Sequence, residues 1–389
     1  MKKIIILLVL VYFAAGCSGG DDKEIITGAE KPQNYLPLIR GKSVGLVVNH
    51  TSMVGETHLV DFLLDNEIEV KKVFAPEHGF RGDASAGEVI KDGVDTKTGI
   101  PVISLYGENK KPQPAHLEDL NALIFDIQDV GCRFYTYIST LHYVIEACAE
   151  NGKPLIVLDR PNPNGDYIAG PVLKPEFESF VGMDPIPVVH GCTVGELAMM
   201  INNEHWHQAP YACELIVVTA DNYTHSREYS LPVKPSPNLP NDLAVRLYPS
   251  LCFFEATSVS VGRGTDFPFQ VLGAPNPELG DFNFTPEDKP GAAINPLHEG
   301  EVCYGMDLRN LKEAPKFTLN YFLEFYGMYD KEEDFLTRER WFNLLAGTDE
   351  LIEQIREGVS EEEIFAGWVT ELEEYKSVRK KYLLYPDFE

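Results

Sequence analysis

Side chains that can transfer protons or bind anions are most densely grouped between residues 73 and 90. The segment holds two kinds of carboxylic acid, an imidazole and a guanidinium: Glu77, His78, Arg81, Asp83 and Glu88. It follows the run Val70–Ala75, which is hydrophobic except for two lysines and predicts a strand ending before Pro76. A solvated loop needs no such variety of ionisable groups behind a buried strand. The pattern therefore predicts a substrate-binding loop with general acid–base chemistry.

Polar side chains also follow other predicted strands. Ligands of open α/β sheets bind beyond the carboxyl ends of the strands, so these side chains are candidates for one site. After the first, fourth and fifth strands they are Asn49, His50, Asp126, Gln128, Asp129, Arg133, Tyr135, Tyr137, Asp159, Arg160, Asn162 and Asn164. Single members fit turn chemistry, but together the carboxylates, amides, arginines and tyrosines favour a polyhydroxylated, acidic substrate such as a sugar acid.

The elements that must position these groups alternate along the chain. Strands are predicted at Ser43–Asn49, Val70–Ala75, Val102–Tyr106, Ala122–Asp126, Leu155–Leu158 and Glu214–Thr219, and several of these are continuous apolar runs. Helices are predicted at Thr57–Asn66, Pro114–Leu120, Ile138–Asn151 and Thr193–Glu204, the last starting with a capping box at Thr193 and Glu196. Strands buried on both faces and separated by helices indicate an α/β fold with a Rossmann-like, doubly wound, mostly parallel sheet.

The chain divides, on this reading, into a processing segment, a tether and two domains. The Rossmann-like catalytic domain is expected at residues 31–245, and an auxiliary α+β domain that closes the cleft at residues 246–389. The Pro-rich segment Leu231–Pro240 cannot form regular structure and is expected to be a rigid loop.

The N-terminus has the features of a lipoprotein signal. Lys2 and Lys3 precede an apolar run, Ile4–Ala15, which is too short to span a bilayer. The sequence Ala14-Ala15-Gly16-Cys17 is similar to a bacterial lipobox, with Cys17 as the lipid acceptor. We therefore expect residues 1–16 to be removed, residues 17–30 to form a flexible tether, and the protein to be lipid-anchored in the cell envelope, at the periplasm or outer membrane. The alternative is an ordinary secretory signal with an incidental cysteine.

The composition of the chain limits the classes of molecule that it is expected to bind. The 389 residues are 44% hydrophobic and carry a formal net charge of −27, which argues against nucleic acid and against membrane contact other than through the anchor. Six further cysteines, none in a CxxC pair, are expected to be unpaired core residues: Cys132, Cys148, Cys192, Cys213, Cys252 and Cys303. No GxGxxG, Walker A or HExxH motif occurs, and the GxSxG match at Gly41–Gly45 enters a strand, where a nucleophile elbow cannot sit.

Several ordered blocks of the sequence resemble the NamZ-type exo-β-N-acetylmuramidases. The blocks are residues 76–82 (PEHGFRG) with 86–88 (AGE), 126–137 (DIQDVGCRFYTY), 159–165 (DRPNPNG), 236–240 (SPNLP), 262–265 (GRGT) with 268–269 (PF), and the tail 379–386 (RKKYLLYP). The resemblance covers nearly the whole chain after the signal. It departs from the family pattern at Ala256 and Ser258, where Gly and Asn are usual, and at Asn276, where Trp is usual.

The resemblance implies hydrolysis of a terminal β-1,4-linked N-acetylmuramic acid from the non-reducing end of peptidoglycan fragments, without metal or cofactor. Glycosidic cleavage generally uses a carboxylic acid and a second carboxylate. Glu77 is the expected acid, with His78 orienting it or holding a hydroxyl, and the second carboxylate is left open among Glu88, Asp126, Asp129 and Glu255. The anionic lactyl group calls for an arginine. Candidates are Arg81, Arg133 and Arg263, and further sugar contacts are expected from Asn49, Glu88, Gln128, Asp129, Tyr135, Asn162 and Asn238.

Two other functions fit parts of the same pattern. A non-catalytic envelope lipoprotein could bind muramic-acid-type sugars in the same cleft, with no acid in position. A metallohydrolase could use His50, His78, Asp126 and His190, although their spacing matches no recognised ligand motif. Substitution of Glu77 by Gln separates an enzyme from a binder, because a binder keeps its affinity.

Overall fold

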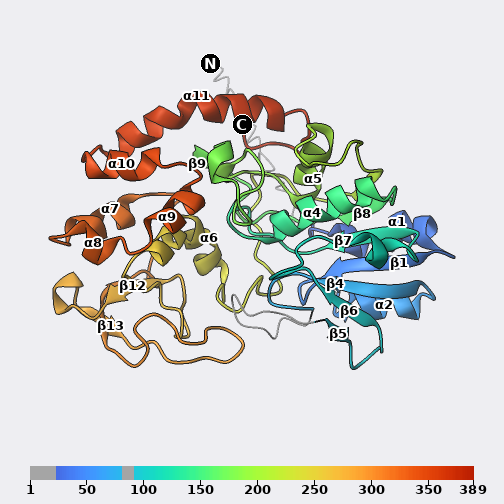
Figure 1. The fold of residues 1–389 in the computed structure, drawn as a ribbon, viewed down its shortest axis with the longest axis horizontal. Coiled ribbons are helices and arrows are strands. Elements are labelled where there is room, and N and C mark those ends of the chain that lie inside the picture. Colours follow the sequence, from blue (N-terminus) through green and yellow to red (C-terminus); the bar gives the residue numbers. More distant parts are fainter. Residues whose placement is uncertain (1–22, 81–91) are drawn as a thin grey trace, which may run out of the picture.

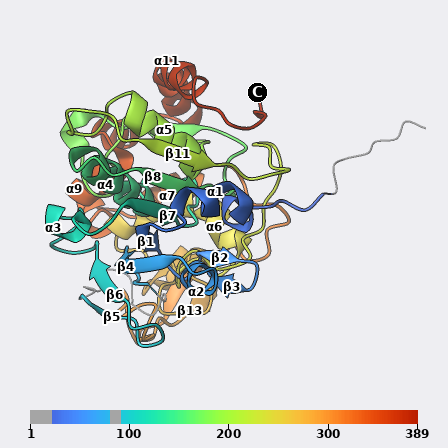
Figure 2. The ribbon, with the colours of Figure 1, turned by 90° about the vertical axis from the view of Figure 1, so that its right-hand side faces the viewer.

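The computed structural model describes residues 23–80 and 92–389. Its centre is a seven-stranded sheet in the order β11-β8-β7-β1-β4-β6-β5. The strands are β1 (Ser43–Val48), β4 (Glu69–Ala75), β5 (Gly93–Val94), β6 (Pro101–Ser104), β7 (Ala122–Asp126), β8 (Leu155–Leu158) and β11 (Leu215–Val218). All pairs are parallel except β5 with β6, and Figure 2 shows the strands following one another from β11 to β6. Counting the parallel strands along the chain gives the order 3-2-1-4-5-6 of the Rossmann fold, which confirms the predicted fold class.

Helices cover both faces of this sheet. Strand β1 shows why: Val44, Leu46 and Val48 pack on one face, and Val47 packs on the other. The first face is covered by α1 (Pro32–Ile39) and α2 (Leu59–Asp65), and the second by α3 (Pro114–Leu117), α4 (Tyr137–Glu150) and α5 (Val194–Asn203). The predicted capping box is present at α5, where Thr193 accepts from the Glu196 amide and Glu196 accepts from the Thr193 amide.

The first half of the chain also contains several short elements outside the main sheet. They are the hairpin β2 (Met53–Val54) and β3 (Thr57–His58), the antiparallel pair β9 (Ala169–Val172) and β10 (Pro187–Val189), and the 3₁₀ turns η1 (Gly28–Glu30) and η2 (Pro175–Phe177). The predicted helix at Thr57–Asn66 therefore begins two residues later, because Thr57 and His58 pair with Val54 and Met53. The Pro-rich segment Leu231–Pro240 contains no helix or strand, as expected.

The second half of the chain is mixed. It contains α6 (Asp242–Leu251), η3 (Cys252–Ala256), β12 (Val271–Ala274), η4 (Pro277–Leu279), β13 (Phe282–Phe284), β14 (Cys303–Asp307), α7 (Asn320–Gly327), α8 (Glu332–Phe335), α9 (Glu339–Ala346), α10 (Glu350–Arg356) and α11 (Glu361–Arg379). Strands β12, β14 and β13 form an antiparallel sheet, and the helices gather on the left in Figure 1.

One hydrophobic core joins the two halves. It runs without a break from Phe125 and Leu141 beneath the main sheet to Phe253 and Phe342 among the later helices. Helix α11 crosses the top of the molecule in Figure 1 and returns to the first half. There the Tyr375 hydroxyl donates to the His190 carbonyl at 2.6 Å, and this contact fixes the later helices against the main sheet.

Beyond α11 the chain end is bound to the main sheet. The Tyr385 hydroxyl donates to Asp159 Oδ2 at 2.6 Å, and the Leu384 amide donates to Glu196 Oε1 at 2.8 Å. Both acids are fully buried. The tail therefore satisfies carboxylates that would otherwise be costly to bury.

The six cysteines after residue 22 are all buried and unpaired, as predicted. Within the described ranges, no helix has the length and apolar character needed to cross a membrane.

Candidate active site

A cleft of about 1030 Å³ lies at the carboxyl-end side of β4. Residues before position 182 form one part of its wall, and residues after position 235 form the rest. Ionisable and aromatic side chains of the lining include Glu77, His78, Tyr106, Lys110, Tyr135, Tyr137, Phe180, Tyr248, Glu255, Arg263, Arg338 and Trp341. The lining thus combines acids, cations and aromatic rings in one concave site, which is the usual composition of a small-ligand site.

A tight turn after β4 places Glu77. The strand ends at Ala75, and the Gly79 amide closes the turn by donating to the Pro76 carbonyl at 3.0 Å. His78 adopts φ +67°, which is uncommon outside glycine, and its side chain is buried while Glu77 is half-buried. Such backbone strain concentrates at functional sites, where the surrounding structure holds it in place.

Thr136 holds the Glu77 carboxylate. It is the N-cap residue of α4, yet its hydroxyl caps no amide of the helix. Instead, Thr136 Oγ1 donates to Glu77 Oε2 at 2.8 Å. An N-cap threonine usually stabilises its own helix with this hydroxyl. The hydroxyl is therefore used to orient the predicted acid. Nearby, burial and the Glu77 charge both raise the pKa of Tyr106, which lines the same cleft.

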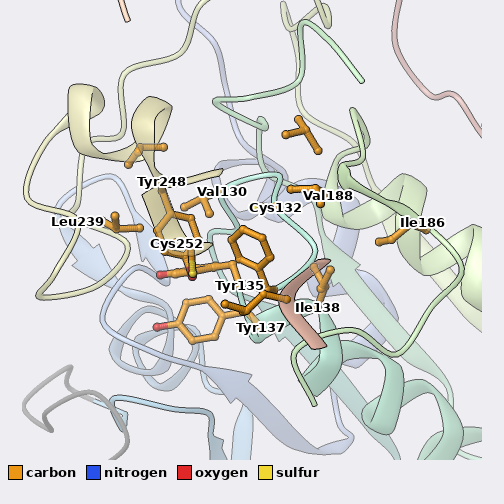
Figure 3. Packing of buried hydrophobic residues seen from close by; sticks show 14 of the residues in the cluster. Val130, Cys132, Tyr135, Tyr137, Ile138, Ile186, Val188, Leu239, Tyr248 and Cys252 are labelled. Carbon is orange, nitrogen blue, oxygen red and sulfur yellow. The ribbon is translucent and has the colours of Figure 1, made fainter. Parts of the chain in front are cut away.

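Two tyrosines join the cleft to the Pro-rich segment. The rings of Tyr135 and Tyr137 meet edge-on with centroids 4.9 Å apart, and Figure 3 shows them beside Tyr248 and Cys252. Their hydroxyls both donate to the Pro235 carbonyl, at 2.8 and 3.2 Å. Burial and the Glu77 charge raise the pKa of Tyr137, so its hydroxyl stays protonated at neutral pH.

Asn238 fixes the far end of the Pro-rich segment. Its side chain lines the cleft and donates to the Ala292 carbonyl at 2.8 Å. Together with the tyrosine contacts, this bond explains why a segment without regular structure can serve as a cleft wall.

Glu255 is the second carboxylate that lines the cleft in the described part of the chain. It lies in η3, next to the fully buried Phe254, which packs against Phe322 and Phe325 and so fixes the local backbone. Arg263 Nε and Nη2 both reach Glu255 Oε1, at 2.7 and 2.6 Å. The pair keeps a carboxylate and its counter-charge together at the cleft wall.

Asp126 does not reach the cleft. It has no exposed surface and forms a bidentate pair with Arg160, with distances of 2.6 Å from Nε to Oδ1 and 2.9 Å from Nη2 to Oδ2. A carboxylate held by both oxygens in the interior cannot approach a sugar. The proposal of Asp126 as second carboxylate is therefore corrected to a structural ion pair.

Asn49, Gln128 and Asp129 also lie off the cleft lining, at the switch point between β1 and β7. Asn49 Oδ1 accepts from the Thr51 amide and hydroxyl, at 2.9 and 2.6 Å. Gln128 donates to the Pro161 carbonyl at 2.8 Å, and Asp129 accepts from the Gly131 amide at 2.7 Å. These side chains bind backbone groups of neighbouring loops and are not part of the cleft lining.

Arg133 and Asn162 are structural as well. The Arg133 guanidinium is fully buried and donates to four carbonyls, those of Pro171, Ile186, Leu345 and Ala346. Burial lowers its pKa to about 10, so it remains charged at neutral pH. Asn162 accepts from the Asn164 amide at 2.8 Å and donates to the Cys192 carbonyl at 2.9 Å. The expectation that both bind substrate is corrected accordingly.

Three predicted residues, Cys17, Arg81 and Glu88, lie outside the described residues. Of the others, the cleft gathers Glu77, His78, Tyr135, Asn238, Glu255 and Arg263. The prediction missed Thr136, although it stands within the sequence block that ends at Tyr137. It also missed Lys110, Phe180, Arg338 and Trp341, which no local motif marks.

The residues considered for a metal site have other partners. His50 Nε2 lies 2.7 Å from the Lys234 carbonyl, and His190 Nε2 lies 3.6 Å from Asp129. Across residues 23–80 and 92–389, no three His, Cys, Asp or Glu side chains are grouped as metal ligands.

The fold and the cleft define an α/β protein with a polar site at the edge of a Rossmann-like sheet. Two family models match this chain. The model of the N-terminal part of the exo-β-N-acetylmuramidase NamZ matches residues 44–243, and the model of its C-terminal part matches residues 246–385. The peptidoglycan β-N-acetylmuramidase NamZ of Bacillus subtilis (strain 168) is 40% identical over 376 residues, covering 90% of this chain and 89% of that protein.

Two crystal structures from Bacteroides fragilis NCTC 9343, both of DUF1343 family proteins, have the same fold. One is 44% identical with a TM-score of 0.87, covering 94% of this chain and 100% of the other. The second is 29% identical with a TM-score of 0.78, covering 93% and 99%. The chain belongs to the NamZ family of exo-β-N-acetylmuramidases, and thereby to the glycosidases.

Proposed function

We propose that this protein releases terminal β-1,4-linked N-acetylmuramic acid from the non-reducing end of peptidoglycan fragments. The observation that carries the proposal is the placement of Glu77 and Glu255 in the lining of one cleft. Glycosidases use two carboxyl groups on the scissile bond, one as proton donor and one as nucleophile or base. Glu77 and Glu255 supply such a pair from parts of the chain far apart in sequence.

We assign proton donation to Glu77. The Thr136 hydroxyl donates to its Oε2 and so orients the carboxyl group at the cleft wall, from which the acid passes its proton to the leaving glycosidic oxygen. Glu255 is the partner carboxylate, either as nucleophile or as the base for water. Arg263 lies 2.6 Å from Glu255 Oε1 and supplies the counter-charge of this carboxylate.

The direction of attack is tested with two disaccharides, one with N-acetylmuramic acid at the non-reducing end and one with it at the reducing end. The proposal predicts that only the first is cleaved, with free N-acetylmuramic acid and N-acetylglucosamine detected by mass spectrometry. Equal cleavage of both would contradict the assignment of the exo site. Binding of the first without cleavage would instead support a sugar-binding lipoprotein.

We further propose that the protein is a lipoprotein of the cell envelope, anchored through Cys17. Support comes from the lysines, short apolar run and Ala-Ala-Gly-Cys sequence at the N-terminus. The lipid-anchored form should partition into detergent in a Triton X-114 phase separation of cells that express the full chain. The Cys17→Ala variant should remain in the aqueous phase or stay uncleaved. Aqueous partitioning of the unchanged protein would refute lipidation.

A further inference from the structure

Cationic side chains line the cleft, although the protein as a whole has a net charge of −27. The described lining contains three: Lys110, Arg263 and Arg338. Arg263 is committed to Glu255 through two nitrogens. Lys110 places its ammonium 4.6 Å from the centroid of the Phe180 ring. The Arg338 side chain is exposed and has no hydrogen bond or ion pair with any residue in the described ranges.

The backbone at Arg338 is nevertheless fixed. Its amide donates to the carbonyl of Ala256 at 3.0 Å, one residue after Glu255. Its own carbonyl accepts from the Trp341 amide at 2.9 Å and so starts α9. This turn brings Arg338 and the half-buried Trp341 to the same cleft wall, beside the segment that carries Glu255. A flexible cationic side chain thus extends from a rigid base next to an indole ring.

We propose that Arg338 binds the carboxylate of the substrate's lactyl ether, with Trp341 against the sugar ring. The inference rests on the proposed muramidase function and deepens it by naming the residue that distinguishes N-acetylmuramic acid from N-acetylglucosamine. A free guanidinium can hold a carboxylate through two parallel hydrogen bonds, whereas a lysine offers a point charge. The indole supplies a large, rigid apolar face for the C–H side of a pyranose.

The other cations fit this role less well. Arg133 is buried beneath the cleft wall with four carbonyl partners, and Arg263 would have to release Glu255. Lys110 already lies over Phe180, on the part of the wall that carries Glu77. Among the cations in the described part of the lining, Arg338 is the one that can bind a carboxylate without breaking an existing contact.

The test changes the enzyme and the substrate together. Chromogenic β-N-acetylmuramic acid glycosides are compared as the free lactyl acid and as its methyl ester, with Arg338→Gln, Arg338→Lys and the unchanged protein. We expect Arg338→Gln to lower kcat/KM about 10- to 100-fold for the acid and less than about twofold for the ester, the range expected for a hydrogen bond to a charged group. Arg338→Lys should recover part of the loss.

Two variants serve as controls. Arg340→Gln alters the same charge at an exposed neighbour that does not line the cleft, and it should leave both substrates unaffected. Lys110→Gln should change the acid and ester alike. If Arg338→Gln changes kcat/KM by the same factor for the acid and the ester, or changes neither, or if discrimination between acid and ester is lost in Lys110→Gln, the proposal is overturned.

Equilibrium binding separates this inference from the proposed reaction. Titration of free N-acetylmuramic acid and its methyl ester into each variant requires no turnover. Acid-selective binding that depends on Arg338, in a protein without hydrolysis, would refute the muramidase and support the carboxylate site. Hydrolysis that does not depend on Arg338 would support the muramidase and refute the carboxylate site.

Discussion

Replacing Arg133 by methionine should destabilise the fold without weakening substrate binding. The guanidinium donates at 2.6–2.9 Å to carbonyls of four residues from two distant regions, Pro171 and Ile186 in one and Leu345 and Ala346 in the other. Methionine reaches about as far as the Nε atom of arginine and has no donor. The variant therefore leaves buried carbonyls without their partner but removes no side chain from the cleft lining, since Arg133 is not part of it.

The size of the effect follows from this geometry. Each buried carbonyl left without a donor costs about 1–3 kcal/mol, but the variant also removes the cost of burying a charge. The Ile186 carbonyl additionally keeps the Leu173 amide as a donor at 3.2 Å. We expect a net loss of about 3–5 kcal/mol, the range found when one partner of a buried charge network is removed. For 389 residues, an unfolding entropy of about 2.1 cal/mol/K per residue converts this loss to a Tm lowered by about 4–6 °C.

Urea unfolding and thermal melts followed by circular dichroism measure the stability, and KM for the muramic glycoside is measured well below the variant's Tm. Arg340→Met is the matched control because its side chain is exposed, and its Tm should stay within about 1 °C of the unchanged protein. A rise in KM of tenfold or more with an unchanged Tm would refute the structural role and return Arg133 to the substrate-binding residues.

Three further predictions concern positioning, pH and packing. Thr136→Val should lower kcat about tenfold by freeing the Glu77 carboxylate, while Thr136→Ser keeps most activity; equal kcat in all three proteins would contradict the positioning role. Burial raises the pKa of Asp159 to about 6, above its unfolded value of about 3.8. The contribution of this group to the free energy of unfolding is therefore complete below pH 4 and is lost as the pH rises through 6. The loss amounts to about 3 kcal/mol. Asp159→Asn should remove this slope from the pH profile of urea unfolding. Gly131→Ala should cost about 2–4 kcal/mol, measured in the same way, because φ is +76° and the new Cβ would lie 2.1 Å from Asn162 Oδ1.

The main sheet could be predicted because its strands are buried on both faces. Ala122–Phe125 and Leu155–Leu158 are uninterrupted apolar runs, and the strands Ala122–Asp126 and Leu155–Leu158 have the predicted bounds. The start of α5 was predictable for a similar local reason, since Thr193 and Glu196 satisfy each other's amides three residues apart. Local burial and local capping need no knowledge of distant contacts.

The site could be predicted only in part, because turn-forming and substrate-binding side chains have the same chemistry. Asn49 and Asn162 follow strands as Glu77 does, yet their amides bind nearby backbone groups instead of lining the cleft. The structural role of Arg133 could not be predicted for a different reason: two of the carbonyls to which it donates, those of Leu345 and Ala346, are more than 200 residues away in sequence. Arg338 and Trp341 are placed at the cleft by contacts such as the one between residues 256 and 338, which no sequence pattern records.

The most direct test of the account is the hydrolysis of a chromogenic β-N-acetylmuramic acid glycoside by the unchanged protein and by Glu77→Gln, beside the β-N-acetylglucosamine analogue. We predict turnover of the muramic glycoside alone and a loss of at least about 100-fold in kcat for Glu77→Gln, with its ligand affinity and Tm retained. The thermal melt and a titration with N-acetylmuramic acid establish that the variant is folded and binds. Full activity in a folded Glu77→Gln variant would contradict the assignment of the catalytic acid.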